Sequence, residues 1–378
     1  MQSFTFNTTP SVHMGTGAIA DLGTRAAAIM QGRVLLVTDA GMIATGLVDL
    51  ALDALRGAGL EVQVFSAVQA DPSETIVLSA AEAAKPCSGV VGFGGGSSLD
   101  VAKLAALLAV SQQPLGSAYG VGNATGPRLP LILVPTTAGT GSEVTPISIV
   151  TTGASEKMGV VSPLILPDLA VLDPQLTKGL PAAVTAATGI DAMVHAIEAY
   201  ASASPNNNPI SRALALEALR LMGSALETAV FEPDDMQARS DMLLGSMLAG
   251  QAFANSPVAA VHALAYPIGG HFKVPHGLSN ALVLPHVMRF NIETASAAYE
   301  NLAKVLFPNS NSGAAGFADN LAELSHRCGV PQSLREVGIT ANDLDLLARD
   351  AMNQSRLLVN NPREVTLQDA RAIYEAAL

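Results

Sequence analysis

The sequence predicts an α/β domain followed by an all-helical domain. Its 378 residues exceed the size at which one hydrophobic core usually stops growing. From residue 33 to residue 134, short β-branched runs alternate with longer segments rich in alanine and leucine, a pattern typical of a parallel sheet with helices on both faces. Beyond about residue 182 the β-branched runs disappear and the apolar spacing becomes helical. We therefore expect domains at residues 1–182 and 183–378.

The composition indicates a well-buried globular protein without affinity for polyanions. Hydrophobic residues make up 49% of the chain and charged residues 14%. Lys and Arg total 20 against 32 Asp and Glu, a formal net charge of -12, which disfavours binding to nucleic acid or to an anionic membrane surface. We find no secretory signal and no apolar run near the roughly eighteen residues of a membrane span. Cys87 and Cys328 lie in alanine- or leucine-rich segments, so we expect no disulfide or thiolate metal site, and a reducing cytoplasm.

The individual elements follow from these patterns. In the first domain we expect strands at Arg33–Thr38, Leu60–Ser66, Gly89–Phe93 and Leu129–Val134, and helices at about Gly46–Arg56, Pro72–Lys85 and Ser97–Val110. Residues 140–182, rich in Gly, Pro, Ser and Thr, form the junction and carry strand-like pieces at Ile147–Thr151 and Leu169–Leu172. In the second domain the helical segments are Thr188–Tyr200, Arg212–Met222, Asp235–Ala254, Glu293–Leu306, Ala314–Cys328 and Gln368–Leu378.

Two glycine-rich segments could bind the phosphates of a nucleotide. Residues 15–20 match the glycine fingerprint of dinucleotide-binding folds, but the polar segment before them is a poor buried strand, so we favour a turn after an N-terminal hairpin. Residues 94–100 are better placed, because they follow a strongly apolar strand and open a helix. Gly95 and Gly96 would let the backbone approach a pyrophosphate, Ser97 could cap the helix, and the helix dipole would favour an anion.

A second loop and an aspartate are expected to border the same ligand. Residues 135–145 follow the next buried strand and are dense in hydroxyl groups. Ligands of open α/β sheets gather beyond the carboxyl ends of the strands, so two such loops indicate one nucleotide. Asp39, at the end of its strand, could accept hydrogen bonds from an adenine-ribose diol and repel a ribose phosphate, or it could be an ordinary helix cap.

The second domain carries a candidate metal site. Asp191 and His195 are four residues apart, which places a carboxylate and an imidazole on one face of a helix. His262, His271 and His276 follow across a segment rich in glycine and proline, which we expect to be a turn. Imidazole and carboxylate ligands suit ferrous iron, zinc, manganese or cobalt, and the donor types leave the element open. The other histidines are assigned to structure: His13, His286 and His326.

The order of four long motifs resembles the iron-containing, or group III, alcohol dehydrogenases, over nearly the whole chain. The motifs are GGGSSLD, PTTAGTGSEVT, TGIDAMVHAIEAY and VHALAYPIGGHFKVPHG. The resemblance implies an N-terminal dinucleotide-binding domain, a helical C-terminal domain and an active site in the cleft between them. We also expect the enzyme to form a homodimer or a larger homo-oligomer, and to be soluble and cytoplasmic because of the absent secretory signal and membrane span and the cysteine usage.

Matched position by position, the resemblance assigns residues to each ligand. The metal ligands, for Fe²⁺ in the first place and Zn²⁺ in the second, are Asp191, His195, His262 and His276. The NAD-binding residues are Asp39, Asp71, Gly95, Gly96, Ser97, Asp100, Thr136, Thr137, Thr140 and Lys157. One position departs from the family, because Tyr266 stands where many members have a further histidine four residues after the third ligand. Proton transfer then falls to Tyr266, or to His271 or water with Tyr266 as a hydrogen-bonding wall.

The function expected from the residues and the resemblance is that of a metal-activated, NAD-dependent alcohol dehydrogenase. It would interconvert a small alcohol or diol and its aldehyde or ketone by hydride transfer. The alternatives are an oxo-acid reductase of the maleylacetate type or a hydroxyacid–oxoacid transhydrogenase of the same superfamily. More distant alternatives are a lyase similar to dehydroquinate synthase and a non-enzymatic module that binds nucleotide and metal.

Overall fold

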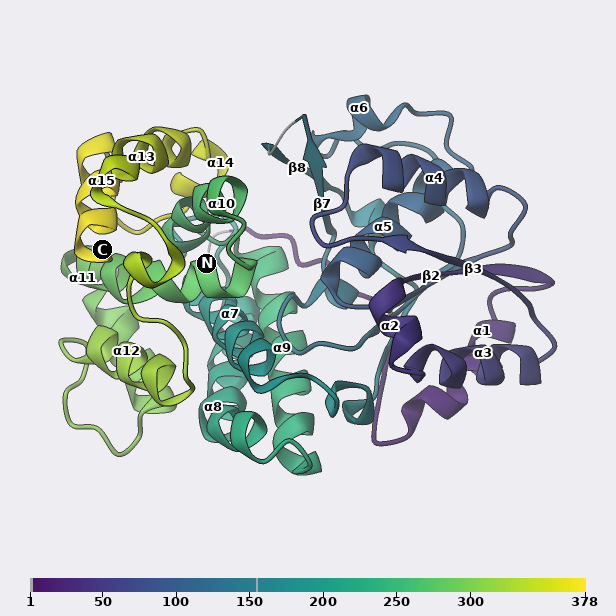
Figure 1. The fold of residues 1–378 in the computed structure, drawn as a ribbon, viewed down its shortest axis with the longest axis horizontal. Helices are drawn as coiled ribbons and strands as arrows, with labels where there is room; N and C mark the ends of the chain where they lie inside the picture. Colours follow the sequence, from purple (N-terminus) through teal and green to yellow (C-terminus); the bar gives the residue numbers. More distant parts are fainter. Residues whose placement is uncertain (1–2, 154–155) are drawn as a thin grey trace. The chain divides into compact units, whose positions relative to one another are not determined.

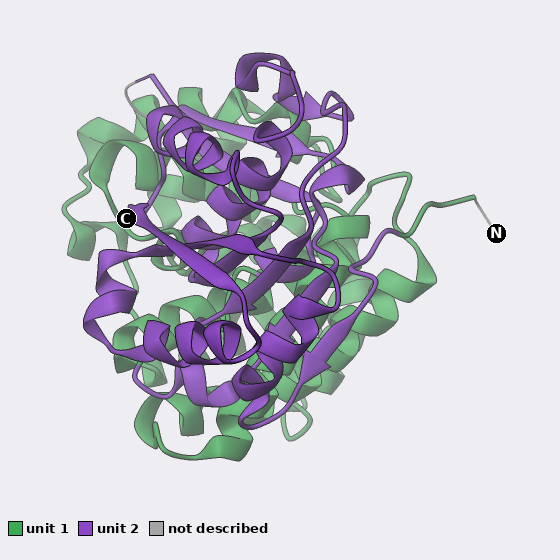
Figure 2. Ribbon diagram, turned by 90° about the vertical axis from the view of Figure 1, so that its right-hand side faces the viewer, with its two compact units in different colours: residues 1–6, 138–140, 180–378 green, residues 7–137, 141–179 purple. Residues whose placement is uncertain are grey.

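The computed structural model describes residues 3–153 and 156–378. The chain divides into two compact units, which Figure 2 shows in different colours. The α/β unit comprises residues 7–137 and 141–179, and the helical unit comprises residues 1–6, 138–140 and 180–378. The expected fold class, an α/β part and a helical part, is confirmed.

A six-stranded sheet forms the centre of the α/β unit. Every pairing in this sheet is parallel, and the strand order is β1-β9-β6-β4-β2-β3. The strands span Val12–Met14 (β1), Arg33–Asp39 (β2), Glu61–Val68 (β3), Val90–Gly94 (β4), Leu131–Pro135 (β6) and Leu169–Leu172 (β9). The four strands expected between residues 33 and 134 are therefore present with small shifts at their ends, and all residues of β4 and β6 are buried.

Helices cover both faces of this sheet because side chains of a strand alternate between its faces. Leu35 and Val37 of β2 pack in one core with α4 (Glu74–Ala84) and α5 (Gly96–Leu108). Val34 and Leu36 pack in the other core, with α1 (Leu22–Ala27) and α3 (Leu47–Gly57). Figure 1 shows these helices on either side of β2 and β3. The buried β-branched runs thus identified strands that are covered on both sides.

The direction of strand addition reverses between β2 and β4. The chain runs from β2 outward to β3, then returns so that β4 pairs with the other side of β2 and continues to β6 and β9. Open parallel sheets bind ligands at such a switch point, outside the carboxyl ends of the strands. In this chain β2 ends at Asp39 and β4 ends at Gly94, so both of these sequence features lie at the switch point.

The N-terminal segment differs from the expected hairpin. Residues 12–14 form an edge strand that pairs in parallel with β9, far along the chain, rather than with a neighbouring antiparallel strand. The glycine turn that follows is closed by Asp173, whose fully buried carboxylate accepts hydrogen bonds from the backbone N–H groups of Gly17 and Ile19, each at 3.1 Å. Those are the N–H groups that a phosphate would need. The fingerprint at residues 15–20 is therefore a structural turn, as the sequence favoured.

The junction and the short elements complete the α/β unit. A second sheet has the order β5-β8-β7, and its strands span Gly120–Val121 (β5), Ile147–Thr152 (β7) and Glu156–Val161 (β8). Short helices span Ala40–Ala44 (α2) and Leu115–Ala118 (α6), with 3-10 turns at Ala18–Asp21, Ser142–Val144, Pro163–Ile165 and Pro174–Thr177.

The helical unit is built on long helices. They span Ala182–Ala201 (α7), Pro209–Phe231 (α8), Met236–Asn255 (α9), Ala260–Phe272 (α10) and His276–Leu306 (α11), followed by Phe317–Arg327 (α12), Leu344–Met352 (α13), Ser355–Leu358 (α14) and Leu367–Ala376 (α15). Two 3-10 turns lie at Leu334–Val337 and Ala341–Asp343. In the described part of the chain, no helix combines the length and apolar character needed to cross a membrane.

The segment from residue 262 to residue 276, expected as a turn, is mostly helical. Helix α10 continues through Pro267, and α11 begins at His276 and continues through Pro285, well before the expected start at Glu293. Both prolines are buried. The apolar residues around them pack into the interior, and this packing outweighs the low helix propensity of proline.

Candidate functional site

One face of α7 carries three buried polar side chains. Asp191, His195 and Glu198 follow each other at spacings of four and three residues, so they share a face of the helix. Each is at most 5% exposed. Three polar groups buried on one stripe need partners that satisfy them.

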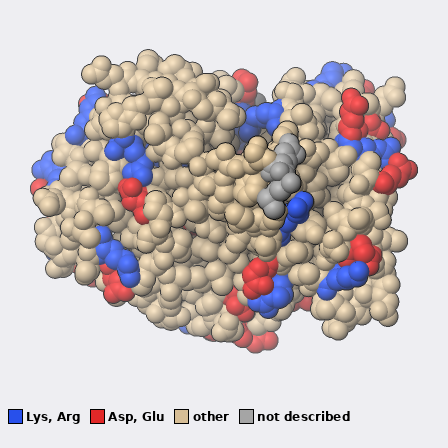
Figure 3. Space-filling view, turned by 180° about the vertical axis from the view of Figure 1, so that it is seen from behind, with Lys and Arg blue, Asp and Glu red and all other residues tan. Residues whose placement is uncertain are grey.

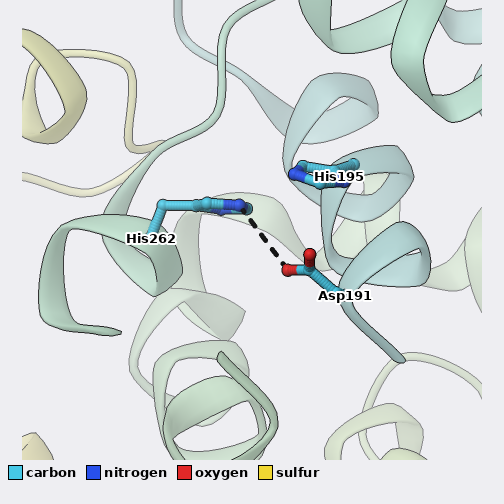
Figure 4. A group of neighbouring side chains, drawn as sticks. All are labelled: Asp191, His195 and His262. Carbon is cyan, nitrogen blue, oxygen red and sulfur yellow. Dashed lines mark ion pairs between the residues drawn. The ribbon is translucent and has the colours of Figure 1, made fainter. Parts of the chain in front are cut away.

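Helix α10 supplies the partner of this face. The ligand atoms of Asp191, His195 and His262 all lie within 4.8 Å of one another, and Figure 4 shows the three side chains. Nε2 of His262 lies 4.0 Å from Oδ1 of Asp191, the pair joined by the dashed line in Figure 4. The two side chains come from helices about seventy residues apart in sequence and are each 3% exposed. The predicted chelating arm on α7 and the first histidine of the second cluster are therefore brought together.

Hydrogen bonds fix which nitrogen of each imidazole faces the cluster. Nδ1–H of His195 donates to the carbonyl oxygen of Gly139 at 3.2 Å, and Nδ1–H of His262 donates to Glu198 Oε2 at 2.7 Å. A carbonyl or carboxylate oxygen only accepts, so in the neutral form of each ring the proton is on Nδ1 and Nε2 carries a lone pair. Among the described residues, Nε2 of His262 is buried without a hydrogen-bond partner. A buried lone pair aimed at a carboxylate and a second imidazole fits a bound cation.

His276 reaches the same carboxylate from the start of α11. Its Nε2 lies 3.8 Å from Oδ1 of Asp191, and Nδ2 of Asn280 donates to Asp191 Oδ1 at 2.5 Å while lying 3.3 Å from Nε2 of His276. Gly277 permits this approach, because a Cβ there would lie 2.4 Å from the carbonyl oxygen of Ala187 on α7. With 42% of its side chain exposed, His276 is the most accessible of the four predicted metal ligands.

The protonation states of the buried groups suit a divalent cation. Burial lowers the pKa of His195 to about 3, so its imidazole is neutral near neutral pH. Burial alone would raise the pKa of Asp191, but the neighbouring imidazoles of His276, His195 and His262 and the Asn280 N–H more than offset this and lower it. The cluster thus offers a carboxylate beside the neutral imidazole of His195, ligand types that zinc and first-row transition metals prefer.

The two candidates for proton transfer, Tyr266 and His271, lie on α10 at different distances from the predicted metal ligands. The ring of Tyr266 is 5.8 Å from the ring of His276, centre to centre, and therefore borders the predicted metal ligands. His271 is nine residues beyond His262, about two and a half helical turns. Its Nε2 pairs with a carboxylate oxygen of Asp350 on α13 at 3.0 Å. Tyr266, rather than His271, is thus close to the cluster.

The glycine loop after β4 lies beside Asp39. Gly94 has a φ of 142°, and a Cβ on it would lie 2.9 Å from Oγ of Ser98, so this close turn requires glycine. Oγ of Ser98 donates to Oδ2 of Asp39 at 3.3 Å, while the backbone N–H of Met42 donates to Oδ1 at 2.9 Å. Asp39 therefore caps α2, one of its two expected roles, and also lies next to the loop that opens α5. Gly95 and Gly96 form the start of α5, with Ser97 following them.

A buried network ties the second predicted loop to α5. Asp100 accepts hydrogen bonds from Oγ of Ser142 at 2.6 Å and from the backbone N–H of Ile149 at 2.9 Å. Lys103, which is fully buried, donates to Ser142 Oγ at 2.8 Å and to the carbonyl oxygen of Ile147 at 2.6 Å. The carboxylate of Asp100 is thus engaged within the protein, and it positions the loop.

The remaining predicted nucleotide residues fall in two places. Thr136 is buried, with its hydroxyl 3.3 Å from Sδ of Met42, and Thr137 lies beside Gly95. Lys157 on β8 pairs with Asp71 at 2.6 Å and donates to Oγ1 of Thr151 at 2.9 Å, so the two residues that the resemblance assigned separately are an ion pair. Thr140 lies in the segment that belongs to the helical unit.

Some functional candidates emerge only from the structure. Glu198 and Asn280 contact predicted metal ligands, and Lys103 contacts the predicted cofactor loop. Glu198 had a signal in the sequence, since its spacing from Asp191 repeats the face of the helix. Asn280 would have been recognised from the sequence only if a helix had been expected to begin at His276, because the two residues are four apart and would then share a face. Lys103 lies in an apolar helix, where a single buried lysine gives no indication of its partners.

The comparisons with known proteins identify the family of the chain. A sequence profile described as "Iron-containing alcohol dehydrogenase" matches residues 9–174, and one described as "Fe-containing alcohol dehydrogenase family, C-terminal" matches residues 185–378. The chain is 42% identical to long-chain-alcohol dehydrogenase 1 of Geobacillus thermodenitrificans (strain NG80-2), over 97% of this chain and 95% of that protein. It is 35% identical to the NAD-dependent methanol dehydrogenase of Bacillus methanolicus, over 98% of each.

A solved structure has the same fold. The crystal structure of a 1,3-propanediol oxidoreductase superposes with a TM-score of 0.95 at 36% identity, over 100% of both chains. The chain belongs to the iron-containing alcohol dehydrogenase family, as its motifs predicted. It is an oxidoreductase that acts on the CH–OH group of alcohols.

Proposed function

We propose that this enzyme oxidises a small primary alcohol or diol with NAD, using one divalent metal ion held by Asp191, His195, His262 and His276. One observation carries the proposal: among the described residues, the buried Nε2 of His262 has no hydrogen-bond partner. This nitrogen faces Oδ1 of Asp191. Iron is the proposed ion and zinc the alternative, because imidazole and carboxylate bind both. The iron-containing family supports the first choice.

The helical unit holds the ion in this proposal, and the hydrogen bonds around the four ligands support it. Gly139 and Glu198 hold the imidazoles of His195 and His262 in the tautomer that ligates through Nε2. Asn280 holds Asp191 and His276 together. When bound, the ion supplies Lewis acidity, which makes an alcohol oxygen more acidic near neutral pH.

Residues 1–182, which contain the α/β unit, hold NAD in this proposal. The support is the loop at the switch point, where Gly95, Gly96 and Ser97 open α5 next to Asp39. Asp39 would accept hydrogen bonds from the adenine ribose and repel a 2′-phosphate, which favours NAD over NADP. The remaining proposed contacts or positioning residues are Asp71, Asp100, Thr136, Thr137, Thr140 and Lys157. When bound, NAD supplies the hydride acceptor.

The substrate is proposed to be uncharged. The chain has a net charge of -12, and the face in Figure 3 shows Lys and Arg scattered among Asp and Glu rather than gathered for a polyanion. Tyr266 is proposed as a hydrogen-bonding wall for the substrate near the ligand set. A homodimer or larger homo-oligomer in the cytoplasm completes the proposal: the family resemblance supports the oligomer, and the sequence features of Cys87 and Cys328 support the cytoplasm.

An assay of NADH formation tests the proposal. Protein prepared anaerobically with Fe²⁺ should oxidise members of a panel of primary alcohols and diols, and His262→Ala should lose metal and most activity. His326→Ala is the matched control, because His326 is an exposed histidine on α12. Full turnover by chelated, metal-free protein would contradict the metal's role. Turnover with NADP exceeding that with NAD would contradict the role of Asp39.

A further inference from the structure

The carboxylate of Glu198 connects α7 to the first turn of α10. Oε1 accepts a hydrogen bond from the backbone N–H of Val261 at 2.7 Å, and Oε2 accepts one from Nδ1–H of His262, also at 2.7 Å. Glu198 and His262 are each about 3% exposed on their side chains. The two oxygens therefore have separate, short, buried contacts on adjacent residues.

The contact with Val261 replaces a missing helix cap. The N-cap residue of α10 is Ala259, whose side chain makes no capping hydrogen bond. The first N–H groups of a helix have no partner within the helix, and a carboxylate near them is favoured by the helix dipole. Glu198 supplies this cap from another helix, so its position is held by the backbone as well as by the imidazole.

We propose that Glu198 is a positioning residue that fixes His262 as the Nδ1–H tautomer, with the lone pair of Nε2 facing Asp191 and His195. The inference rests on the proposed metal site and adds a residue to it. A carboxylate carries no proton to donate, so both of its contacts require N–H groups on the other side. In the neutral imidazole the remaining ring nitrogen, Nε2, is then the acceptor, and it is the nitrogen without a hydrogen-bond partner in the described structure.

An isosteric amide should reverse this arrangement. In Glu198→Gln, the single oxygen of the side chain can accept the N–H of Val261, which leaves the NH₂ group facing Nδ1 of His262. That nitrogen would then have to accept, so the proton would move to Nε2, where it blocks ligation. Mutation of a residue that hydrogen-bonds to a metal ligand typically lowers metal affinity by about tenfold to a hundredfold. We expect a loss of that size, although the side chain keeps its shape.

The tautomer can be observed without any metal. Metal-free protein labelled with ¹⁵N on its seven histidines should show His262 protonated on Nδ1, with the signal assigned by its absence from His262→Asn. Glu198→Gln should shift His262 to the Nε2–H form, whereas Glu198→Asp, which keeps the carboxylate, should retain the Nδ1–H form. The matched control is Glu217→Gln, because Glu217 is an exposed carboxylate on α8 that pairs with Arg220.

The second readout is the dissociation constant of Zn²⁺, measured by calorimetric titration with Zn²⁺ alone. Glu198→Gln should bind Zn²⁺ about tenfold to a hundredfold more weakly than wild type, and Glu217→Gln should match wild type. Wild-type His262 protonated on Nε2 would overturn the proposal, and this spectrum needs no variant to fold. Unchanged Zn²⁺ affinity in Glu198→Gln, or weaker binding with an unchanged tautomer, would also overturn it. Wild-type protein that binds no Zn²⁺ would contradict the metal site itself, and the tautomer spectra would then decide the role of Glu198.

Discussion

Replacing Lys103 with methionine should destabilise the α/β unit and loosen its predicted cofactor loop. Nζ of Lys103 donates to the hydroxyls of Ser142 and Thr145, at 2.8 and 3.2 Å, and to the carbonyl oxygen of Ile147 at 2.6 Å. Asp100 lies 3.5 Å away as its anionic partner. Methionine has a similar shape but donates no hydrogen bond, so these acceptors would lose their buried partner.

The loss in free energy of unfolding can be estimated from the burial of Lys103 and from the hydrogen bonds that Asp100 keeps in the variant. Removing one member of a buried ion pair costs about 3–5 kcal/mol in free energy of unfolding. Asp100 keeps its hydrogen bonds from Ser142 and Ile149, so the lower end, about 3 kcal/mol, applies. In a unit of this size 1 kcal/mol corresponds to roughly 2–4 °C in Tm. Lys103→Met should therefore lower Tm by about 6–12 °C.

Thermal unfolding followed by circular dichroism measures the loss, and NADH fluorescence measures the dissociation constant of the cofactor. The variant should bind NADH more weakly, because residues 142–147 are the segment that Lys103 holds. Lys85→Met is the matched control, since the side chain of Lys85 is 55% exposed and forms a surface ion pair with Glu82. A Tm and an NADH affinity equal to those of wild type would refute the reasoning.

Three further predictions follow from single residues. Burial raises the pKa of Glu143 from 4.5 to about 7, partly offset by Lys103, so its stabilising contribution is present below pH 4.5 and is lost as pH rises through about 7. The stability of Glu143→Gln relative to wild type should thus increase between about pH 5 and about pH 8 in urea unfolding, and a difference independent of pH would count against this. Asp39→Gly should raise the ratio of kcat/KM for NADP to that for NAD by about fivefold or more, from roughly 1 kcal/mol of relieved charge repulsion, and an unchanged ratio would show that Asp39 does not face the ribose. Tyr266→Phe should lose less than about tenfold in kcat, because removal of a true acid–base group costs about a hundredfold to ten-thousandfold. A thousandfold loss with a missing limb in the pH–rate profile would instead make Tyr266 the proton carrier.

The strands of the main sheet could be predicted because their signal is local. Strand β4 is buried on both faces, and a short apolar run bounded by glycines is enough to indicate it. The edge strand β1 carries no such signal, since it is polar and partly exposed. Its partner is β9, more than 150 residues away, and no local pattern shows that pairing. The expected hairpin was wrong for this reason.

The candidate site shows the same limit. The spacing of Asp191 and His195 placed both on one face of a helix, and the structure shows them together with His262. Glycine and proline around residue 270 predicted a turn, but burial of the apolar residues keeps α10 helical. The groups that orient the ligands, Gly139 and Glu198, come from segments 56 and 64 residues from the histidines they hold. Such contacts depend on how the helices pack, which the sequence pattern leaves undetermined.

The central claim is that Asp191, His195, His262 and His276 hold one metal ion. Anomalous diffraction at the iron edge, from crystals of enzyme prepared anaerobically with Fe²⁺ and active in the same batch, tests it most directly. The account predicts one peak, about 2.0–2.3 Å from a carboxylate oxygen of Asp191 and from Nε2 of each of the three imidazoles. An active enzyme whose anomalous peak lies away from these side chains, or that shows none, would contradict it.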